Sequence, residues 1–354
     1  MSRYKSLIVL AFGLLSFFLW TAQAPAEDPY DPETLRAIDK ATAWLLAAQQ
    51  PDGSWSCDIQ GQGDVGTTCV AALALMSAGN TRQRGRHHQA IKRATAFVLQ
   101  HARQMDGSVY PAGAATQPQY KIGHHIHTYF TVIFFSQALG MLGDAELDNQ
   151  IASELARLVG YIDRTQQADG SWNDSSTEPM ITTVIAWEAL RSAFSAGIEI
   201  QAAGVDKTLQ YIRESCYDPA SGIFRDLRWG GASNLRFITQ GGALRVLYGM
   251  GEGKTEMAKK GTEALFHTTF AQDYGGSAGG EDFLGALFAT QALLHEEGAT
   301  WQRWWGTTRK TLADLQNADG SWTGHHCITG RTFCTATALW TLLLPKRILP
   351  MTQM

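Results

Sequence analysis

The sequence predicts an all-α protein, an (α/α)6 toroid in which six outer helices surround six inner helices. Three observations predict this fold: a repeated motif, weaker copies of it at similar spacing, and an alternation of amphipathic and wholly apolar helices. The motif Gln-x-x-Asp-Gly-Ser-Trp occurs three times, at 49–55, 166–172 and 316–322. Weaker copies at 106–109, 221–224 and 275–277 bring the number of units to six. Repeats of this length are typical of stacked supersecondary units.

The first helix of each unit is predicted to be an outer one, because it has one polar face. In 148–166, for example, Leu155, Val159 and Ile162 are spaced by four and three residues, with charged residues between them. This spacing predicts a helix that is buried on one side only. The outer helices are expected at 31–49, 89–103, 148–166, 205–216, 257–270 and 300–316.

The second helix of each unit is apolar almost all round, as the run from Val70 to Met76 shows. A helix without a polar face is buried on every side, which places these helices in the inner ring. They are expected at 67–78, 128–142, 182–196, 237–250, 283–295 and 332–344. The long loops then gather at the amino ends of the inner helices, where functional residues concentrate on such a scaffold.

The repeated motif itself is interpreted as structural. Its glutamine can bond free carbonyls at the end of an outer helix, Asp-Gly forms the turn, and the tryptophan packs back over that turn.

Residues 1–26 are predicted to be a signal peptide, and 27–354 a single toroidal domain. Arg3 and Lys5 precede an apolar run at 7–20, and Ala24-Pro25-Ala26 suits cleavage before Glu27. An uncleaved membrane anchor is the alternative. We therefore expect an exported protein, periplasmic or extracellular. The net charge of −4 and the lack of a long basic run argue against nucleic acid as a partner.

The motif on paired helices resembles the repeats of squalene/oxidosqualene cyclases and of protein prenyltransferase β-subunits. This resemblance implies a central cavity that handles an isoprenoid or another apolar ligand. The Asp-x-Asp-Asp acid motif of the cyclases and the Asp-Asp-x-x-Asp motif are absent. The resemblance also implies zinc as a cofactor at Asp282 and Cys334, although Leu284 stands where the transferases have a cysteine ligand. Whether the chain is a catalyst is therefore left open.

The mouth of the ring contains the candidate site residues. Unpaired N–H groups of the inner helices favour anions there. Carboxylates from units one, three and five are candidates for acid–base catalysis on a sugar or uronate, with capping of their helices as the alternative. These catalytic candidates are Asp64, Glu178 and Asp282, with Glu281 beside the last.

The candidate ligand-binding residues are His125, His127, Tyr129, Arg236 and Arg331. In a loop, His125 and His127 point the same way and could bind a metal with Asp64 or Glu178. In a helix that begins at His124, their rings point apart.

Four cysteines flank the loops of the first and last units, which are neighbours in a closed ring. Export favours disulfides among them, and a four-cysteine metal site is the alternative. They are Cys57, Cys69, Cys327 and Cys334.

Three hypotheses for function remain at this stage. The first is a cyclase- or prenyltransferase-like protein with a small-molecule or lipid ligand. The second is a non-catalytic binding scaffold of the cell envelope, with a protein or ligand as partner. The third is a carbohydrate-active enzyme that uses the cavity carboxylates.

Overall fold

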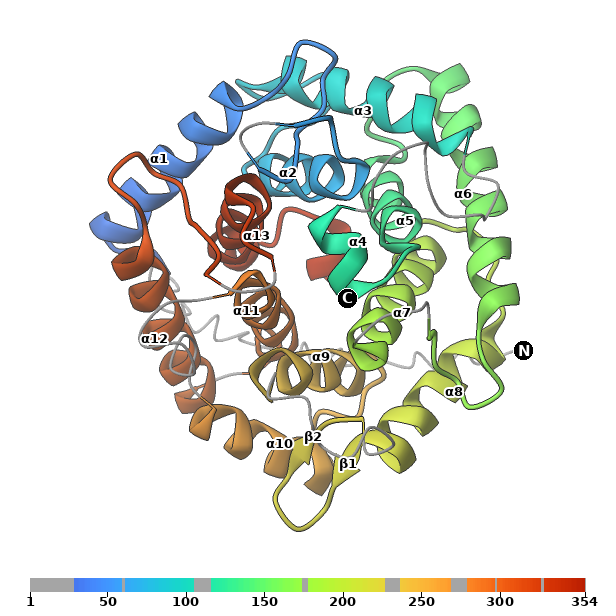
Figure 1. Ribbon diagram of the computed structural model, residues 1–354, viewed down its shortest axis with the longest axis vertical. Coiled ribbons are helices and arrows are strands. Elements are labelled where there is room, and N and C mark those ends of the chain that lie inside the picture. The colour runs from blue at the N-terminus through green and yellow to red at the C-terminus, as the bar shows by residue number, and fades with distance from the viewer. Residues whose placement is uncertain are drawn as a thin grey trace, which may run out of the picture.

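The computed structural model confirms the all-α toroid: an outer ring of helices encloses an inner ring (Figure 1). It describes residues 29–58, 61–104, 116–173, 178–226, 236–268, 279–296, 298–325 and 328–353. The predicted signal peptide lies outside the described residues. Within the described part of the chain, no helix is long and apolar enough to cross a membrane.

The inner ring consists of helices buried along nearly their whole length. Successive inner helices contact one another, and the last contacts the first, so the ring closes. Alanine, threonine and glycine are frequent on these helices, which lets their backbones approach closely. A Cβ at Gly241 of α9, for example, would lie 2.5 Å from the carbonyl oxygen of Gly285 in α11. The inner helices are α2 (Val65–Ser77), α5 (Ile126–Ala138), α7 (Pro179–Ser195), α9 (Arg236–Gly249), α11 (Gly280–Leu293) and α13 (Arg331–Leu343).

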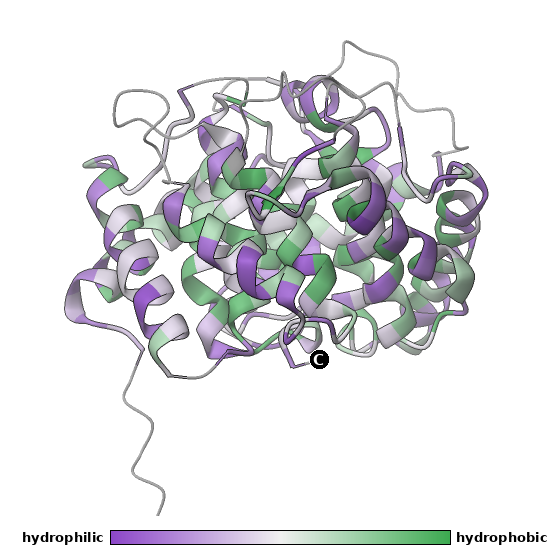
Figure 2. Cartoon of the chain, turned by 90° about the horizontal axis from the view of Figure 1, so that it is seen from below, coloured by the Kyte–Doolittle hydropathy of each residue, from purple (hydrophilic) through white to green (hydrophobic). Residues whose placement is uncertain are grey.

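The outer helices each pack on the inner helix that precedes them in the chain, and α1 packs on α13 to close the ring. Seen edge-on, polar and apolar residues alternate along the outer helices (Figure 2), as the sequence predicted. The predicted ends agree with the structure to within a few residues. The outer helices are α1 (Pro32–Ala47), α3 (His88–Ala102), α6 (Ala145–Thr165), α8 (Ala202–Tyr211, continued by a π-helical turn, Ile212–Cys216), α10 (Glu256–His267) and α12 (Ala299–Leu315).

The three full copies of the motif fasten neighbouring outer helices to each other. Gln49 Nε2 donates to the carbonyl oxygen of Gly53 in its own turn (3.0 Å) and to that of Ala90 in α3 (2.9 Å). Gln166 and Gln316 make the matching pairs of bonds, to Gly204 of α8 and to Ala37 of α1 respectively. The structural interpretation of the motif is confirmed, and its third copy closes the ring.

The tryptophan and aspartate of each copy hold the turn in place. Trp55 is fully buried, and its Nε1 donates to the carbonyl oxygen of Leu45 (2.7 Å). Asp52 accepts hydrogen bonds from the amide and hydroxyl of Ser54. Gly53 has a φ of 93°, and a Cβ there would lie 2.5 Å from the carbonyl oxygen of Arg93. Only glycine fits this turn, because any side chain would strike the next outer helix.

The fourth corner uses a different fastening, which the sequence did not reveal. A two-residue hairpin, β1 (Tyr217–Asp218) with β2 (Ile223–Phe224), replaces the Gln-x-x-Asp-Gly-Ser-Trp turn. Here the bridging amide comes from the inner helix α9. Gln240 Nε2 donates to the carbonyl oxygens of Gly222 (3.0 Å) and of Gly261 in α10 (2.7 Å).

Two short segments lie across the two ends of the ring. Helix α4 (Gln117–Ile122) lies over the amino ends of the inner helices, within the ring in Figure 1. The carboxyl-terminal residues form two 3-10 turns, Leu344–Lys346 and Pro350–Thr352, at the opposite end. The amide of Met351 donates to Gln137 Oε1 near the end of α5 (2.9 Å). The site at the mouth is therefore covered by α4, and the other end by the tail.

Candidate functional site

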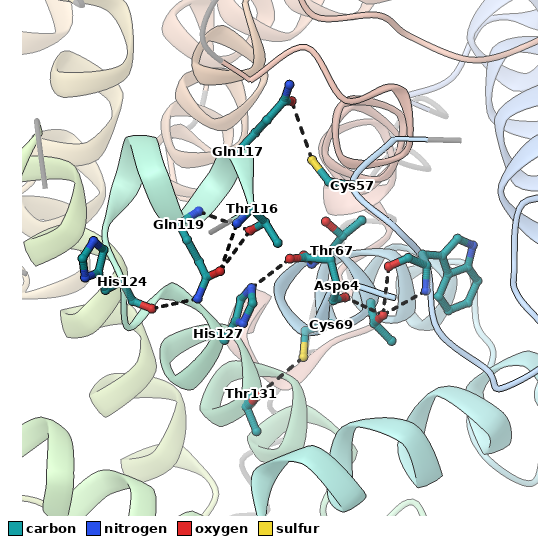
Figure 3. Close-up of polar contacts among 12 residues, drawn as sticks. Cys57, Asp64, Thr67, Cys69, Thr116, Gln117, Gln119, His124, His127 and Thr131 are labelled. Carbon is teal, nitrogen blue, oxygen red and sulfur yellow. Dashed lines mark hydrogen bonds and ion pairs between the residues drawn. The ribbon is translucent and has the colours of Figure 1, made fainter. Parts of the chain in front are cut away.

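Helix α4 joins two sides of the mouth through a single glutamine. Gln117 Nε2 donates to Thr329 Oγ1 (2.9 Å), and its Oε1 accepts from the amides of Thr329 and Gly330 (both 3.0 Å). Gly330 is the residue before α13, so these bonds join the second unit to the sixth. Figure 3 shows Gln117 also facing Cys57, whose Sγ lies 3.9 Å from its Oε1.

The sequence explains why α4 forms inside a long connection. Thr116 and Gln119 make a reciprocal capping box, and Pro118 occupies one of the first helical positions. This signal was present in the sequence and was missed in the prediction of helix pairs alone.

Beneath α4, Asp64 and His127 form a buried pair between the first two inner helices. His127 Nε2 lies 2.8 Å from Asp64 Oδ2, and the two residues are 4% and 1% exposed (Figure 3). Asp64 is also the amino-terminal cap of α2, where it accepts from the amide of Thr67. Both residues were predicted site residues, and the structure brings them together.

Electrostatics keeps Asp64 ionised. Burial by itself would raise the pKa of its carboxyl group, but the charge and hydrogen bond of His127, with the bonds from Thr67, outweigh burial and lower the pKa to about 2. With the carboxylate ionised, the His127 Nε2 must donate to it. The other ring nitrogen, Nδ1, is buried and has no hydrogen-bond partner among the described residues.

Phenyl rings lie on one side of this pair. A Cβ at Gly66 would lie 3.1 Å from His127 Cδ2 and 3.6 Å from Phe130 Cδ2, so the imidazole and the phenyl ring lie against the same part of α2. The rings of Phe130 and Phe333, from α5 and α13, are 6.4 Å apart and meet edge to face. A polar pair next to buried phenyl rings suits a ligand that is mostly apolar but carries one polar group.

A second polar group at the mouth is centred on Lys121 of α4. Its Nζ lies 3.5 Å from a carboxylate oxygen of Glu178 and 3.9 Å from one of Glu281. These carboxylates precede α7 and open α11, and both residues are at most 9% exposed. Carboxylates from units three and five thus face each other as predicted, but the fifth unit supplies Glu281.

Asp282, by contrast, caps its own helix. Its Oδ2 accepts from the amide of Gly279 (2.7 Å). Lys121 was not among the predicted site residues, because the sequence gave no sign that 117–122 crosses the mouth.

The predicted zinc site does not fit the residues that the structure places there. Cys334 Sγ faces the carbonyl oxygen of Ile328 at 3.7 Å, while Asp282 is occupied with its cap. Across the described part of the chain, no three His, Cys, Asp or Glu residues gather as metal ligands.

None of the described cysteines forms a disulfide: they are Cys57, Cys69, Cys216 and Cys334. None of the predicted disulfides forms among them, and Cys327 lies outside the described residues. Burial, followed by the charge of Asp64, raises the pKa of the Cys57 thiol, and burial also raises the pKa values of Cys69 and Cys334. These thiols are therefore protonated and are weak nucleophiles at neutral pH.

The remaining predicted ligand residues lie away from the Asp64–His127 pair. His125 Nε2 lies 2.7 Å from the Tyr161 hydroxyl of α6, so the rings of His125 and His127 have different partners. Burial, followed by the charge of His124, lowers the pKa of His125 to about 4, which leaves the ring neutral at pH 7. His125 and Tyr129 line a cavity of about 320 Å³ beside the turn that contains Trp172.

The two predicted arginines have separate outcomes. Arg331 bonds Asp319 and Ser321 of the third motif copy, and its guanidinium lies 5.4 Å from the centre of the Trp44 ring. It is therefore part of the ring-closing corner. Arg236 is the first residue of α9, and its side chain is not among those described.

Fold and mouth together define this chain as an α/α toroid with a covered site at the amino ends of its inner helices. The chain belongs to the prenyltransferase alpha-alpha toroid domain family, whose model matches residues 112–343. The model of the squalene-hopene cyclase N-terminal domain matches residues 29–110. No curated protein shows a significant sequence match to the chain.

Solved structures with this fold include enzymes of different chemistry. The GH76A alpha-1,6-mannanase from Salegentibacter sp. HEL1_6 superposes with a TM-score of 0.60 at 10% identity, over 89% of this chain and 99% of its own. A polysaccharide lyase gives 0.55 at 12% identity, over 89% and 96%. A variant of the type II terpene cyclase MstE from Scytonema, bound to geranylgeranyl dihydroxybenzoate, gives 0.54 at 13% identity, over 90% and 98%. At these identities the likeness establishes the fold alone.

Proposed function

We propose that this chain is an exported toroid that binds an isoprenoid-class, largely apolar ligand within its inner ring, beneath α4, and that Asp64 and His127 act on a polar group of that ligand. The observation that carries the proposal is the buried Asp64–His127 pair with its unpartnered Nδ1. A buried polar atom without a hydrogen-bond partner costs about 1–3 kcal/mol. The Nδ1 of His127 therefore favours a ligand that supplies this partner. Membership of the toroid family and the phenyl rings of Phe130 and Phe333 support an apolar ligand.

The pair suits general-base catalysis at an oxygen. Asp64 accepts the Nε2–H of His127, so Nδ1 is the acceptor whenever the imidazole carries a single proton. A ligand hydroxyl placed there transfers its proton: the O–H bond breaks, an Nδ1–H bond forms, and the Asp64 carboxylate stabilises the imidazolium. Return of this proton from Nδ1 to the product restores the imidazole.

Protonation of an alkene is less well supported. That reaction needs a carboxylic acid that still carries its proton, but the lowered pKa of Asp64 leaves a carboxylate at neutral pH. The chain also lacks the Asp-x-Asp-Asp motif. We therefore place the chemistry at a hydroxyl, carbonyl or similar group on the ligand.

Hydrolysis or elimination of a carbohydrate is the second candidate, because Glu178 and Glu281 face each other at the mouth and two neighbours in fold act on polysaccharides. Acid–base catalysis by such a pair needs one protonated and one ionised carboxyl group. Both carboxylates are instead paired with the ammonium of Lys121, at 3.5 and 3.9 Å. This arrangement makes the apolar-ligand proposal the better supported.

The test combines ligand retention with reactivity. Protein from the exported fraction is analysed by native mass spectrometry, and its solvent extract by lipid chromatography. We expect an isoprenoid-class compound, and His127→Gln, once circular dichroism shows that it is folded, should retain the unreacted form. Farnesol and geranylgeraniol serve as direct binding probes.

Binding of mannan or uronate oligosaccharides without binding of either isoprenoid alcohol would support the carbohydrate reading and overturn the proposal. If the protein and its His127→Gln variant retain the same compound in the same chemical state, the chain is a binding scaffold without catalysis. Absence from the exported fraction would contradict the predicted signal peptide.

A further inference from the structure

A second cavity lies at the other end of the ring, away from the mouth. Its volume is about 390 Å³, and it opens between the last turns of α7, the end of α9 and the start of α8. Apolar side chains form much of its wall, and Phe194 is 65% exposed, the second most exposed of the large apolar side chains that the structure describes. The apolar lining consists of Phe194, Ile200, Val205 and Met250.

Two hydrogen-bond donors on residues that line this cavity have no partner. Trp187 is fully buried, yet its Nε1 has no acceptor among the described residues. Arg191 Nη1 is likewise buried and unpaired within the described part of the chain. Each buried donor without an acceptor lowers the stability of the fold. Two of them beside one cavity indicate that a ligand with an acceptor group binds here.

Both side chains pack against the glycine that ends α9. A Cβ on Gly249 would lie 2.1 Å from Arg191 Nη1 and 2.3 Å from Trp187 Cη2. The guanidinium and the indole thus occupy the space that a side chain at this position would need. The guanidinium of Arg191 also lies 5.5 Å from the centre of the Trp187 ring, so one aromatic surface positions it.

The charge at this end of the ring favours an anion. Arg245 lies over the same indole (5.6 Å), but it forms a two-bond ion pair with Glu188 (2.8 and 2.9 Å). Arg191 forms no ion pair with any described carboxylate. Burial, and after it the charges of Arg245, Arg347 and Arg191, lowers the pKa of His295 nearby.

Two carboxylates complete the surroundings. Asp206 is an exposed residue at the cavity rim, and Glu296 accepts from the Tyr248 hydroxyl (2.7 Å). The carboxylate of Glu188 acts on the charge of Arg191 as well as pairing with Arg245. Two guanidinium groups therefore share one carboxylate, next to two unused donors and an apolar wall.

We propose that this cavity is a binding site for a small carboxylate with an apolar chain. The carboxylate accepts hydrogen bonds from Trp187 Nε1 and Arg191 Nη1. The chain packs against Val205, Met250 and Phe194, which would otherwise be exposed. The site is separate from the Asp64–His127 pair and does not depend on the function proposed for the mouth.

The test measures decanoate binding to the whole protein by calorimetry and by the change in tryptophan fluorescence. Decanol has the same chain without the charge, and decyltrimethylammonium has the opposite charge. We expect saturable binding of decanoate, at least about tenfold tighter than of either comparator, which corresponds to about 1.4 kcal/mol. Arg191→Gln should lose about tenfold, and Trp187→Phe, which keeps the apolar ring but not the donor, a smaller amount.

Arg84→Gln is the matched control, because it removes an arginine charge from an exposed loop far along the chain. It should bind decanoate as the unaltered protein does. Gly249→Ala is a second, independent variant that displaces the Arg191 guanidinium and the Trp187 indole and should also weaken binding. Near-ultraviolet circular dichroism confirms that each variant is folded.

Equal binding of decanoate and decanol, with no effect of Arg191→Gln in a folded protein, would show an apolar pocket without carboxylate recognition and overturn the proposal. So would the absence of saturable decanoate binding, or a loss in Arg84→Gln as large as in Arg191→Gln.

Discussion

Asp64 performs two tasks with one carboxylate: it caps α2 and it orients His127. One oxygen accepts from the amide of Thr67, and the other from His127. The helix start therefore fixes the position of the imidazole on the neighbouring inner helix. A change at this residue affects the stability of the ring and the reactivity of the site together.

We expect Asp64→Asn to lower the free energy of unfolding by about 2 kcal/mol at neutral pH, because asparagine still caps the helix but does not carry the charge that pairs with His127. The folded-state pKa of Asp64 is lowered, from 3.8 to about 2. Its contribution is thus complete above about pH 4 and is lost as the pH falls toward about 2. Urea unfolding of both proteins at pH 7, 5 and 3.5 measures the difference. A difference that stays constant over this range would contradict the assigned pKa.

The sequence could name Asp64 and His127 but could not pair them. They are 63 residues apart, and their contact depends on how two inner helices are rotated about their axes. The same limit applies to Glu281 and Asp282. Adjacent residues of a helix point about 100° apart, and helical pattern alone did not show which one faces the mouth.

At the scale of single elements, α4 is the part that the repeat pattern could not supply, since it belongs to one unit only. Its bonds to α13 through Gln117, and its ion pairs to Glu178 and Glu281 through Lys121, make it a cover that rests on polar contacts. Ile122 anchors its last turn in the core, but the helix has only six residues, and short covering segments open at lower free energy than the core.

Lys121→Met should destabilise the cover, because it leaves the nearly buried Glu281 and Glu178 without their shared cation. We expect a loss of about 1–3 kcal/mol and faster amide hydrogen exchange in 117–122. The double variant Lys121→Met, Glu281→Gln should recover part of this loss. No change in exchange within α4 would show that other contacts hold it.

The buried pair Glu188–Arg245 fastens α7 to α9 with two bonds inside the inner ring. Arg245→Met should cost about 3–5 kcal/mol because it leaves a buried carboxylate unpaired. Glu188→Gln, Arg245→Met together should cost less than Arg245→Met alone. Thermal unfolding of the two variants checks this order, and equal losses would show that packing, not the unpaired charge, sets the cost.

At the scale of the whole molecule, the predicted architecture holds because three identical motifs repeat one local fastening around the ring. In each copy the glutamine bonds the glycine of its own turn, four residues away, so a short motif marks the turn in the sequence. The motif in turn marks where one helix pair ends and the next begins. The fourth corner is the exception: Gln240 acts from an inner helix, 18 and 21 residues from its partner glycines, and not from within the turn itself. The seven-residue motif is therefore absent at this corner, although the same kind of fastening is present.

Among the three glutamines, Gln316 should be the most sensitive to replacement. Gln316→Ala removes the bond to Ala37 that joins the last outer helix to the first, whereas Gln49→Ala and Gln166→Ala remove bonds between helices that the chain already connects. We expect each to cost about 1–3 kcal/mol, with Gln316→Ala at the upper end. Denaturant unfolding of the three variants gives the ranking, and equal losses would mean that ring closure rests on helix packing alone.

The closure between α1 and α13 also has a consequence for synthesis of the protein. The inner surface of α1 packs on a helix that leaves the ribosome last, so the growing chain is an open crescent with two apolar edges until residue 343 has emerged. Exposed edges of this kind bind chaperones or each other. Two crescents that meet before completion can exchange their terminal helices, so we expect an interlocked dimer as the misassembled product.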